Sequence, residues 1–314
     1  MKSYLHLALL LIPLLSFSQT PSPVSKIIYF DSIWKESTED NYKYYRIIKD
    51  YYSDNSTYEV FNYYKSGTLE MAGKSTNKDY LVKEGQFVHY YENGNKKTVS
   101  KYTKSKPIGK QYNWYENGQP KSEIEYLENQ KEIDTDPKII QFYNAQNVQT
   151  VVDGNGDYED LNNGFFESGK IKNGLHDGIW KGYSKKPKYT FVENYENGKL
   201  ISGTSIDSTN IEHSYKKVYQ YPVPKKGMNN FYSYIGKAMK IPNAAKNTVF
   251  GKIYLTFVIE TDGSIVETKI IKGLGYALDE EAIRILKNYK DWNPGVMRGI
   301  PVRVLYSLPI TIAK

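Results

Sequence analysis

The chain contains few residue patterns that could support metal binding or catalysis. Asp153-Gly-Asn-Gly-Asp157 begins like a calcium-binding loop, whose carboxylates at alternate positions would coordinate the ion. However, the sixth position is Tyr158, where such a loop requires glycine, and the twelfth is Gly164, where it requires glutamate. A polar hairpin turn is therefore the better interpretation of this segment.

Nucleophilic and acid–base chemistry have no better support. The chain has no cysteine, and its histidines lie at no spacing typical of metal ligands or of a nucleophile with its base: His6, His89, His176 and His213. Asp279 and Glu281 could form an acid pair, but they fall at an expected helix start, where negative charge offsets the helix dipole. The sequence predicts a protein that is not an enzyme and has no metal site, no cofactor and no small-molecule substrate.

The last quarter of the chain has the pattern of a small domain. Two extended segments meet at Asp262-Gly263, a dipeptide that tolerates the positive φ of a hairpin turn. A helix is expected next, because apolar residues recur at helical spacing from Leu278 to Tyr289. With an amphipathic helix before them, Phe231 to Lys240, and a strand after them, these elements give the order α-β-β-α-β within residues 229–314.

This order resembles the C-terminal domain of TonB-type energy transducers from roughly Asn229 to Ile312. The resemblance depends on an ordered set of residues with expected structural roles: Pro242, Gly251, Asp262, Gly263, Leu278, Asp279, Ala282, Trp292, Pro294, Gly299 and Pro309. Ile241 stands where the family has an aromatic residue before the proline. In the family, the last strand accepts an extended peptide of an outer-membrane transporter. The resemblance therefore implies such a segment, or another envelope protein, as the partner.

The segment that matches this last strand is Gly299 to Ile312. Alternation predicts one inward row packed under the helix, consisting of Ile300, Val302, Val304, Tyr306 and Leu308. Arg303, Leu305 and Ser307 would face the other way. Because an exposed strand edge invites pairing, we expect the backbone edge to bind the peptide and these three residues to contact it.

The middle of the chain is a repeat array. A motif of aromatic residues followed by a turn recurs in six segments, one of them degenerate: Tyr63-Tyr-Lys-Ser-Gly67, Tyr90-Tyr-Glu-Asn-Gly94, Trp114-Tyr-Glu-Asn-Gly118, Phe142-Tyr-Asn-Ala145, Phe165-Phe-Glu-Ser-Gly169 and Asn194-Tyr-Glu-Asn-Gly198. Asn-Gly and Ser-Gly mark tight hairpins, so each glycine is expected in a turn. One hairpin cannot bury its own face, so the hairpins should stack into a mainly β array over residues 58–204. Residues 19–57 would form an N-terminal segment with a candidate capping hairpin, and residues 205–228 a linker.

The array resembles MORN-type repeats, in the divergent bacterial form found in antitoxin-like proteins, from roughly Tyr58 to Ile201. An antitoxin role is disfavoured, because a secreted chain would not meet a cytoplasmic toxin. We expect the array to act as a rigid spacer or as a second interaction surface.

The N-terminus has the pattern of a secretory signal peptide in residues 1–18. Met1-Lys2 precedes an apolar run from Leu5 to Phe17, and small residues precede the predicted cleavage between Ser18 and Gln19. The run of about 13 residues would reach roughly 20 Å as a helix, short of the roughly 30 Å hydrocarbon core. We expect a periplasmic protein whose association with a membrane is indirect at most.

Composition agrees with a folded chain outside the cytoplasm. The chain has 314 residues, with 39% hydrophobic and 25% charged residues, so it has room for two or more domains. The net charge of +7 comes from lysines scattered among glutamates, which favours a solvated sheet face over nucleic-acid binding.

Three functions agree with these features. The first is a periplasmic adaptor that is not an enzyme and captures a transporter peptide by β-strand addition. The second keeps the N-terminal segment as an anchor and makes the chain an energy transducer that couples proton motive force to outer-membrane transport. The third treats the aromatic hairpins as a glycan-binding array of the cell envelope.

Overall fold

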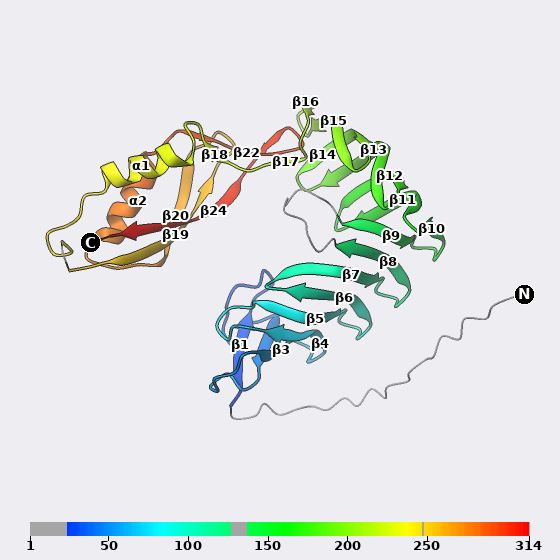
Figure 1. Cartoon of the computed structure of the whole chain (residues 1–314), viewed down its shortest axis with the longest axis horizontal. Coiled ribbons are helices and arrows are strands. Elements are labelled where there is room, and N and C mark those ends of the chain that lie inside the picture. The colour runs from blue at the N-terminus through cyan, green and yellow to red at the C-terminus, as the bar shows by residue number, and fades with distance from the viewer. Residues whose placement is uncertain (1–23, 127–136, 247, 314) are drawn as a thin grey trace, which may run out of the picture. The chain divides into compact units, whose positions relative to one another are not determined.

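The computed structural model describes residues 24–126, 137–246 and 248–313, and the chain divides into two compact units, 1–131 and 132–314 (Figure 1). The predicted signal peptide and its cleavage site lie outside the described residues. The prediction of a mainly β protein, with a hairpin array followed by a small α/β domain, is confirmed. The array has sixteen strands, eight in each unit.

The first unit consists of antiparallel strands that pair in sequence order. Their bounds are β1 Lys26–Phe30, β2 Tyr44–Ile48, β3 Tyr58–Tyr64, β4 Leu69–Ser75, β5 Lys83–Tyr90, β6 Lys96–Thr103, β7 Lys106–Trp114 and β8 Pro120–Tyr126. Three of the predicted turn glycines, Gly67, Gly94 and Gly118, close hairpins with φ near +85°. In each turn the glycine amide donates to the carbonyl three residues earlier, at 2.9 Å. The bulge in the pairing just before each turn is the one that a left-handed glycine produces.

The second unit continues the array in the same way. Its array strands are β9 Lys138–Tyr143, β10 Gln149–Val152, β11 Asn155–Asn162, β12 Phe165–Lys172, β13 Leu175–Lys185, β14 Lys188–Glu196, β15 Lys199–Asp207 and β16 Glu212–Tyr215. Four of its turns have two consecutive residues with positive φ, as the two-residue hairpin turn requires: Asp153-Gly154, Asn163-Gly164, Asn173-Gly174 and Asn197-Gly198. The first of these confirms the polar turn expected in place of a calcium loop.

The expected turn at Gly169 is wrong. Gly169 lies inside β12, and the turn before this strand is Asn163-Gly164. The motif misleads here because an aromatic pair followed by a small residue and glycine also suits the middle of a strand, where a neighbouring ring can cover the glycine.

Each half of the array buries one row of side chains. The first unit has a cluster of Ile48, Tyr58, Val60, Met71 and Phe87. The corresponding cluster of the second unit is Phe142, Val151, Ile171, Trp180 and Tyr195. Alternate residues of a strand face opposite sides of a sheet, so the other side is the exposed one. It carries polar residues together with apolar side chains such as Ile179 and Val192.

The rest of the second unit forms the terminal domain. Its elements are β17 Tyr219–Gln220, β18 Val223–Pro224, α1 Met228–Ala238, β19 Gly251–Ile259, β20 Ile265–Lys272, α2 Leu278–Asn288, β21 Trp292–Asn293, β22 Gly295–Met297, β23 Ile300–Val302 and β24 Val304–Ile312. The main sheet has the order β20-β19-β24, and β17-β22-β23 and β18-β21 form two small ones. Residues 205–228, expected as a linker, thus hold the end of β15 and three short strands, of which β17 and β18 pair with the terminal domain.

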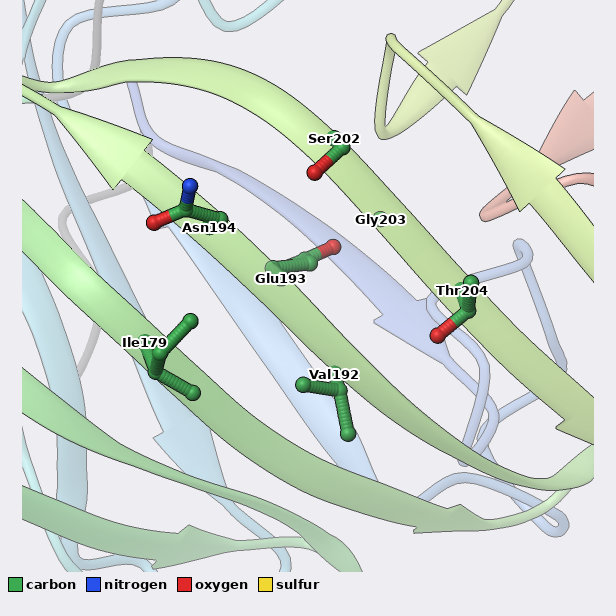
Figure 2. A pocket seen from close by; sticks show the side chains of 7 residues that line it. All are labelled: Ile179, Val192, Glu193, Asn194, Ser202, Gly203 and Thr204. Carbon is green, nitrogen blue, oxygen red and sulfur yellow. The ribbon is translucent and has the colours of Figure 1, made fainter.

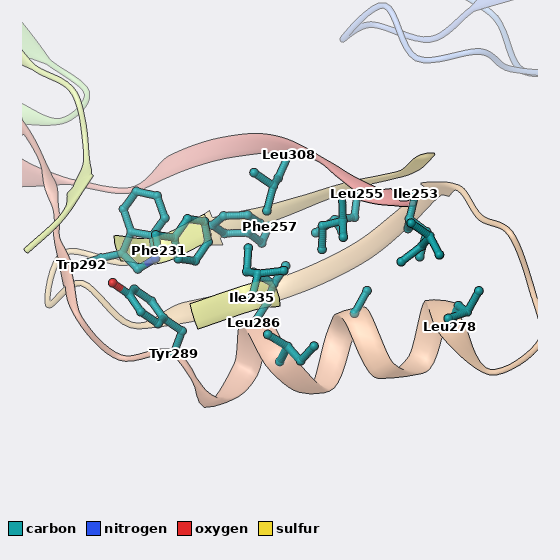
Figure 3. Close-up of a cluster of buried hydrophobic side chains, with 14 of the residues drawn as sticks. Phe231, Ile235, Ile253, Leu255, Phe257, Leu278, Leu286, Tyr289, Trp292 and Leu308 are labelled. Carbon is teal, nitrogen blue, oxygen red and sulfur yellow. The ribbon is translucent and has the colours of Figure 1, made fainter. Parts of the chain in front are cut away.

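Both helices pack on one face of the main sheet (Figure 3). The buried residues of α2, Leu278, Ala282, Ile285 and Leu286, recur at helical spacing and meet the inward residues of β19 and β24. The acidic first turn of α2 favours its start electrostatically. The helices therefore cover one face of the main sheet.

Candidate functional site

The expected binding strand, β24, lies at an edge of the main sheet. It pairs with β19 alone, in an unbroken antiparallel register from Gly251 opposite Ile312 to Ile259 opposite Val304. Within the described ranges no further strand pairs with its outer edge. One long side of β24 is therefore available for backbone pairing.

The backbone direction along this edge follows from a hydrogen bond in the β19–β20 turn. The Glu260 amide donates to the Ser264 carbonyl at 2.9 Å, so Glu260 directs its backbone groups toward β20. Because direction alternates along a strand, Ile259 and every second residue before it face β24. By the same alternation, the odd-numbered residues of β24 direct their N–H and C=O groups to the free edge.

Pro309 agrees with this assignment. Proline has no N–H, so it fits a strand where it need not donate to a neighbour. Its position in the register, opposite Tyr254, directs its nitrogen to the free edge. The free edge thus offers amide donors at Leu305, Ser307 and Thr311 and lacks one at Pro309.

The three predicted contact residues come together on the exposed side of the strand. Leu305 is 67% exposed. Arg303 is not a free cation, because its Nε lies 2.8 Å from Glu260 and its Nη2 lies 2.7 Å from Glu267. The hydrogen bonds that Arg303 donates to Glu267 and Glu260 raise the pKa of its guanidinium above the usual value. Ser307 lies opposite Thr256.

The inward row is partly as expected. Tyr306, Leu308 and the following alternate residues pack against the core. The segment is not one continuous strand, however, because Ile300–Val302 forms the separate strand β23, which folds back on β22. Ile300 and Val302 therefore belong to another small sheet.

Residues expected to have structural roles lie in the core and at element ends. Leu278, Ala282 and Trp292 are fully buried. Asp279 accepts the Leu274 amide at 3.0 Å, and thereby holds the loop before α2. The Ser264 amide donates to Asp262 at 2.8 Å, and hydrogen bonds from the hydroxyl and the amide of Ser264 lower the pKa of Asp262. The others lie as follows: Pro242 after α1, Gly251 at the start of β19, Gly263 in the β19–β20 turn, Pro294 between β21 and β22, Gly299 in the β22–β23 turn and Pro309 within β24.

A second candidate is a hollow over β13, β14 and β15 (Figure 2). Its lining consists of Ile179, Val192, Glu193, Asn194, Ser202, Gly203 and Thr204. Ile179 and Val192 are 53% and 43% exposed, and the lining contains no histidine, cysteine or lysine. Glu193 directs its carboxylate to the opposite side of the sheet from Val192 and Asn194, since its neighbours alternate. The hollow offers weak apolar contacts and no evident acid–base pair.

Three of the four histidines lie in the described ranges, and each has a neighbouring side chain as a partner; His6 lies outside these ranges. His89 lies 3.1 Å from Glu70, and His213 lies 2.8 Å from Asp207. The His176 ring packs on Trp180, with centroids 3.7 Å apart. Within the part of the chain that the structure describes, no group of three or more acidic, histidine or cysteine residues could hold a metal ion.

The sequence did not point to a buried polar group in β14. The inward row of this strand is Tyr189, Phe191, Glu193 and Tyr195, and all four are buried. Glu193 forms an ion pair with Arg298 from the β22–β23 turn, at 2.9 Å. A charged residue in an otherwise aromatic inward row was the available signal.

Three large rings of the array are buried rather than exposed. Phe87, Phe142 and Trp180 are at most 1% exposed. A ring must present an open face to stack on a sugar, so these three rings are unsuited to glycan binding.

The comparison with known proteins gives a family match for the terminal domain. Neither helix in the described ranges has the length and apolar character needed to cross a bilayer. No curated protein matches the chain. Residues 242–311, which include the β24 edge, match the family model of the Gram-negative bacterial TonB protein C-terminal, so this part of the chain is TonB-like, as its residues predicted.

Proposed function

We propose that this protein is a periplasmic adaptor, not an enzyme, whose β24 edge captures an extended peptide of an outer-membrane transporter. The family match supports a TonB-like role in protein interaction within the cell envelope. We further propose that the partner is a transporter segment, that it binds by strand addition, and that the protein does not catalyse a reaction.

The free edge of β24 is the observation that carries this proposal. A strand that pairs regularly with β19 over nine positions is a rigid template, so β24 itself loses little conformational entropy when a peptide adds to it. The outward amides of Leu305 and Ser307 would give the peptide backbone its first hydrogen bonds. The missing donor at Pro309 would end the ladder toward the C-terminus.

The side chains around this edge supply limited specificity. Leu305 gives the peptide an exposed apolar contact. Arg303 donates hydrogen bonds to Glu260 and Glu267. The cluster of these three side chains therefore has two carboxylates and one guanidinium. A peptide with an apolar residue opposite Leu305 and a basic residue beside the carboxylates fits this surface best.

Proline substitution at an outward position tests the proposal. In the full-length protein, Ser307→Pro removes one outward amide and leaves the pairing with β19 intact, whereas Ser307→Ala removes only the hydroxyl. We expect Ser307→Pro to weaken binding of immobilised transporter segments by about tenfold and Ser307→Ala to leave it within about twofold. Equal binding by the two variants would refute strand addition at this edge.

The mature N-terminus separates an adaptor from an anchored transducer. N-terminal sequencing of the protein purified from a periplasmic extract should give Gln19 as the first residue. Recovery of the chain in the membrane fraction with Met1 retained would favour the energy-transducer alternative.

A further inference from the structure

The turn between β22 and β23 belongs to the terminal domain but lies against the end of the array. The Ser205 hydroxyl of β15 donates to the Arg298 carbonyl at 2.6 Å. Gly299 approaches β16 so closely that a Cβ at this position would lie 2.7 Å from the Cβ of His213. Its φ of +79° is also one that glycine adopts without strain. The backbone of this turn is therefore fitted to the array strands.

Arg298 extends from this turn into a buried polar site. Its Nε donates to Glu193 Oε1 at 2.9 Å, and its Nη2 lies 3.4 Å from Oε2. Arg298 is 7% exposed and Glu193 is 2% exposed. Removing two charges from water is costly, so such a pair persists only where the surroundings satisfy both groups.

The surroundings do satisfy the carboxylate. The Tyr215 hydroxyl donates to Oε1 of Glu193 at 2.8 Å, and the Tyr195 hydroxyl donates to Oε2 at 3.1 Å. Each carboxylate oxygen thus accepts one phenol proton and faces one guanidinium nitrogen. The two phenol hydrogen bonds thus help to fix the plane of the carboxylate that faces Arg298.

The guanidinium also has aromatic partners. Its Cζ lies 3.9 Å from the centroid of the Phe191 ring and 5.2 Å from that of Phe165. Burial alone would lower the pKa of Arg298, but the adjacent Glu193 carboxylate raises it above its usual value. A planar, weakly hydrated cation suits a carboxylate flanked by ring faces better than an ammonium ion does.

We propose that the last hairpins of the array form a guanidinium-binding site, and that Arg298 occupies it to hold the terminal domain on the array. The site consists of Glu193, Phe165, Phe191, Tyr195 and Tyr215. The ligand that this site binds is a guanidinium group, here that of Arg298 in the same chain. Since β24 begins six residues after Arg298, the occupied site also fixes where the free strand edge starts relative to the array.

Chemical rescue of the full-length protein tests this proposal. Arg298→Ala leaves Glu193 buried without its cation, and we expect the melting temperature to fall by roughly 10 °C. Trypsin cleavage in residues 216–227, which contain four lysines, should accelerate on the order of tenfold because β17 and β18 lose their fixed partners. Millimolar guanidinium should restore both properties, and sodium at equal ionic strength should not.

Three further variants make the result specific. Glu193→Gln combined with Arg298→Ala removes the buried charge, so guanidinium should have no effect on it. Arg284→Ala, which removes an exposed arginine paired with Glu281, should show neither faster cleavage nor rescue. Arg298→Lys keeps the positive charge and loses the planar guanidinium. If the alanine variant does not fold, the trypsin cleavage rate of this lysine variant tests the proposal instead, and we expect it to be faster than that of the wild type. Wild-type cleavage of the lysine variant, or absence of rescue in a folded alanine variant, would overturn the proposal.

Discussion

The indole ring of Trp180 covers Gly169 on the neighbouring strand, where a Cβ would overlap atoms of the ring. Three other pairs of this kind occur: Gly73 with Phe87, Gly182 with Phe191 and Gly203 with Tyr215. Trp180 itself is 1% exposed. In these four places the array makes room for a large ring by having no side chain on the residue beneath it.

This packing predicts the effect of adding one methyl group. Gly169→Ala should lower the free energy of unfolding by about 1–3 kcal/mol, because the ring must leave its place. Gly236→Ala is the matched control, since that glycine lies within α1 and a Cβ there would meet nothing within 4 Å. The control should be neutral or stabilising by up to about 1 kcal/mol. Urea unfolding checks both, and equal effects would contradict the packing described.

The packing of Trp292 predicts a large loss of stability when this side chain is shortened. It is fully buried, and its ring lies 5.2 Å from Phe231 and 5.1 Å from Tyr306. Trp292→Ala should lower the free energy of unfolding by about 3–5 kcal/mol, and Trp292→Phe by less, because more of the ring volume is retained. Calorimetry of the two variants measures the difference. A loss below about 1 kcal/mol in the alanine variant would be inconsistent with a filled core at this position.

His176 predicts a dependence of stability on pH. Burial, with the nearby Arg298 cation, lowers the pKa of His176 to about 4. The unfolded chain binds this proton below about 6.5 and the folded chain only below about 4, so stability falls as the pH decreases through this window. The loss should approach about 3 kcal/mol at the acidic end.

His176→Phe keeps a ring on Trp180 and removes the titration. Its melting temperature should therefore change less between pH 7 and pH 5 than that of the wild type. Scanning calorimetry at the two pH values gives the comparison. Parallel slopes for the two proteins would show that His176 does not carry the effect.

The direction of the backbone amides in β24 predicts that proline substitutions at two positions of this strand differ in their cost to stability. Val304 directs its amide toward Ile259 of β19, so Val304→Pro removes a donor from the sheet and should cost about 3 kcal/mol or more. Ser307 directs its amide to the free edge, and Ser307→Pro should cost less than about 1 kcal/mol. Urea unfolding of the two variants checks the assignment. The reverse order would show that the free edge carries the even-numbered residues.

Local chemistry made the terminal fold predictable. Helical spacing from Leu278 to Leu286 and the turn signal at Asp262-Gly263 each depend on a few neighbouring residues, so the sequence alone carries them. The strand break at Arg303 was not predictable, because alternation runs through it unchanged. Only the return of β23 onto β22 separates the two strands.

The candidate site was predictable in position but not in its partners. The outward direction of Leu305 follows from alternation, and the structure leaves this side chain exposed. The two carboxylates that fix Arg303 come from residues 36 and 43 positions away, Glu267 in β20 and Glu260 in the β19–β20 turn. The Glu193–Arg298 pair is more distant still, so its only sequence signal was a charge in an aromatic row.

Glu193 and Arg298 are 105 residues apart, so Glu193 is synthesised long before the arginine that pairs with it. Array hairpins form from neighbouring residues as the chain emerges, but the last of them keep an unmatched carboxylate until residue 298 has been made. A product cut short before residue 298 would retain this charge without its counter-ion and would open more readily to proteases. The presence of Arg298 thus distinguishes a chain that includes the β22–β23 turn from products that stop before it.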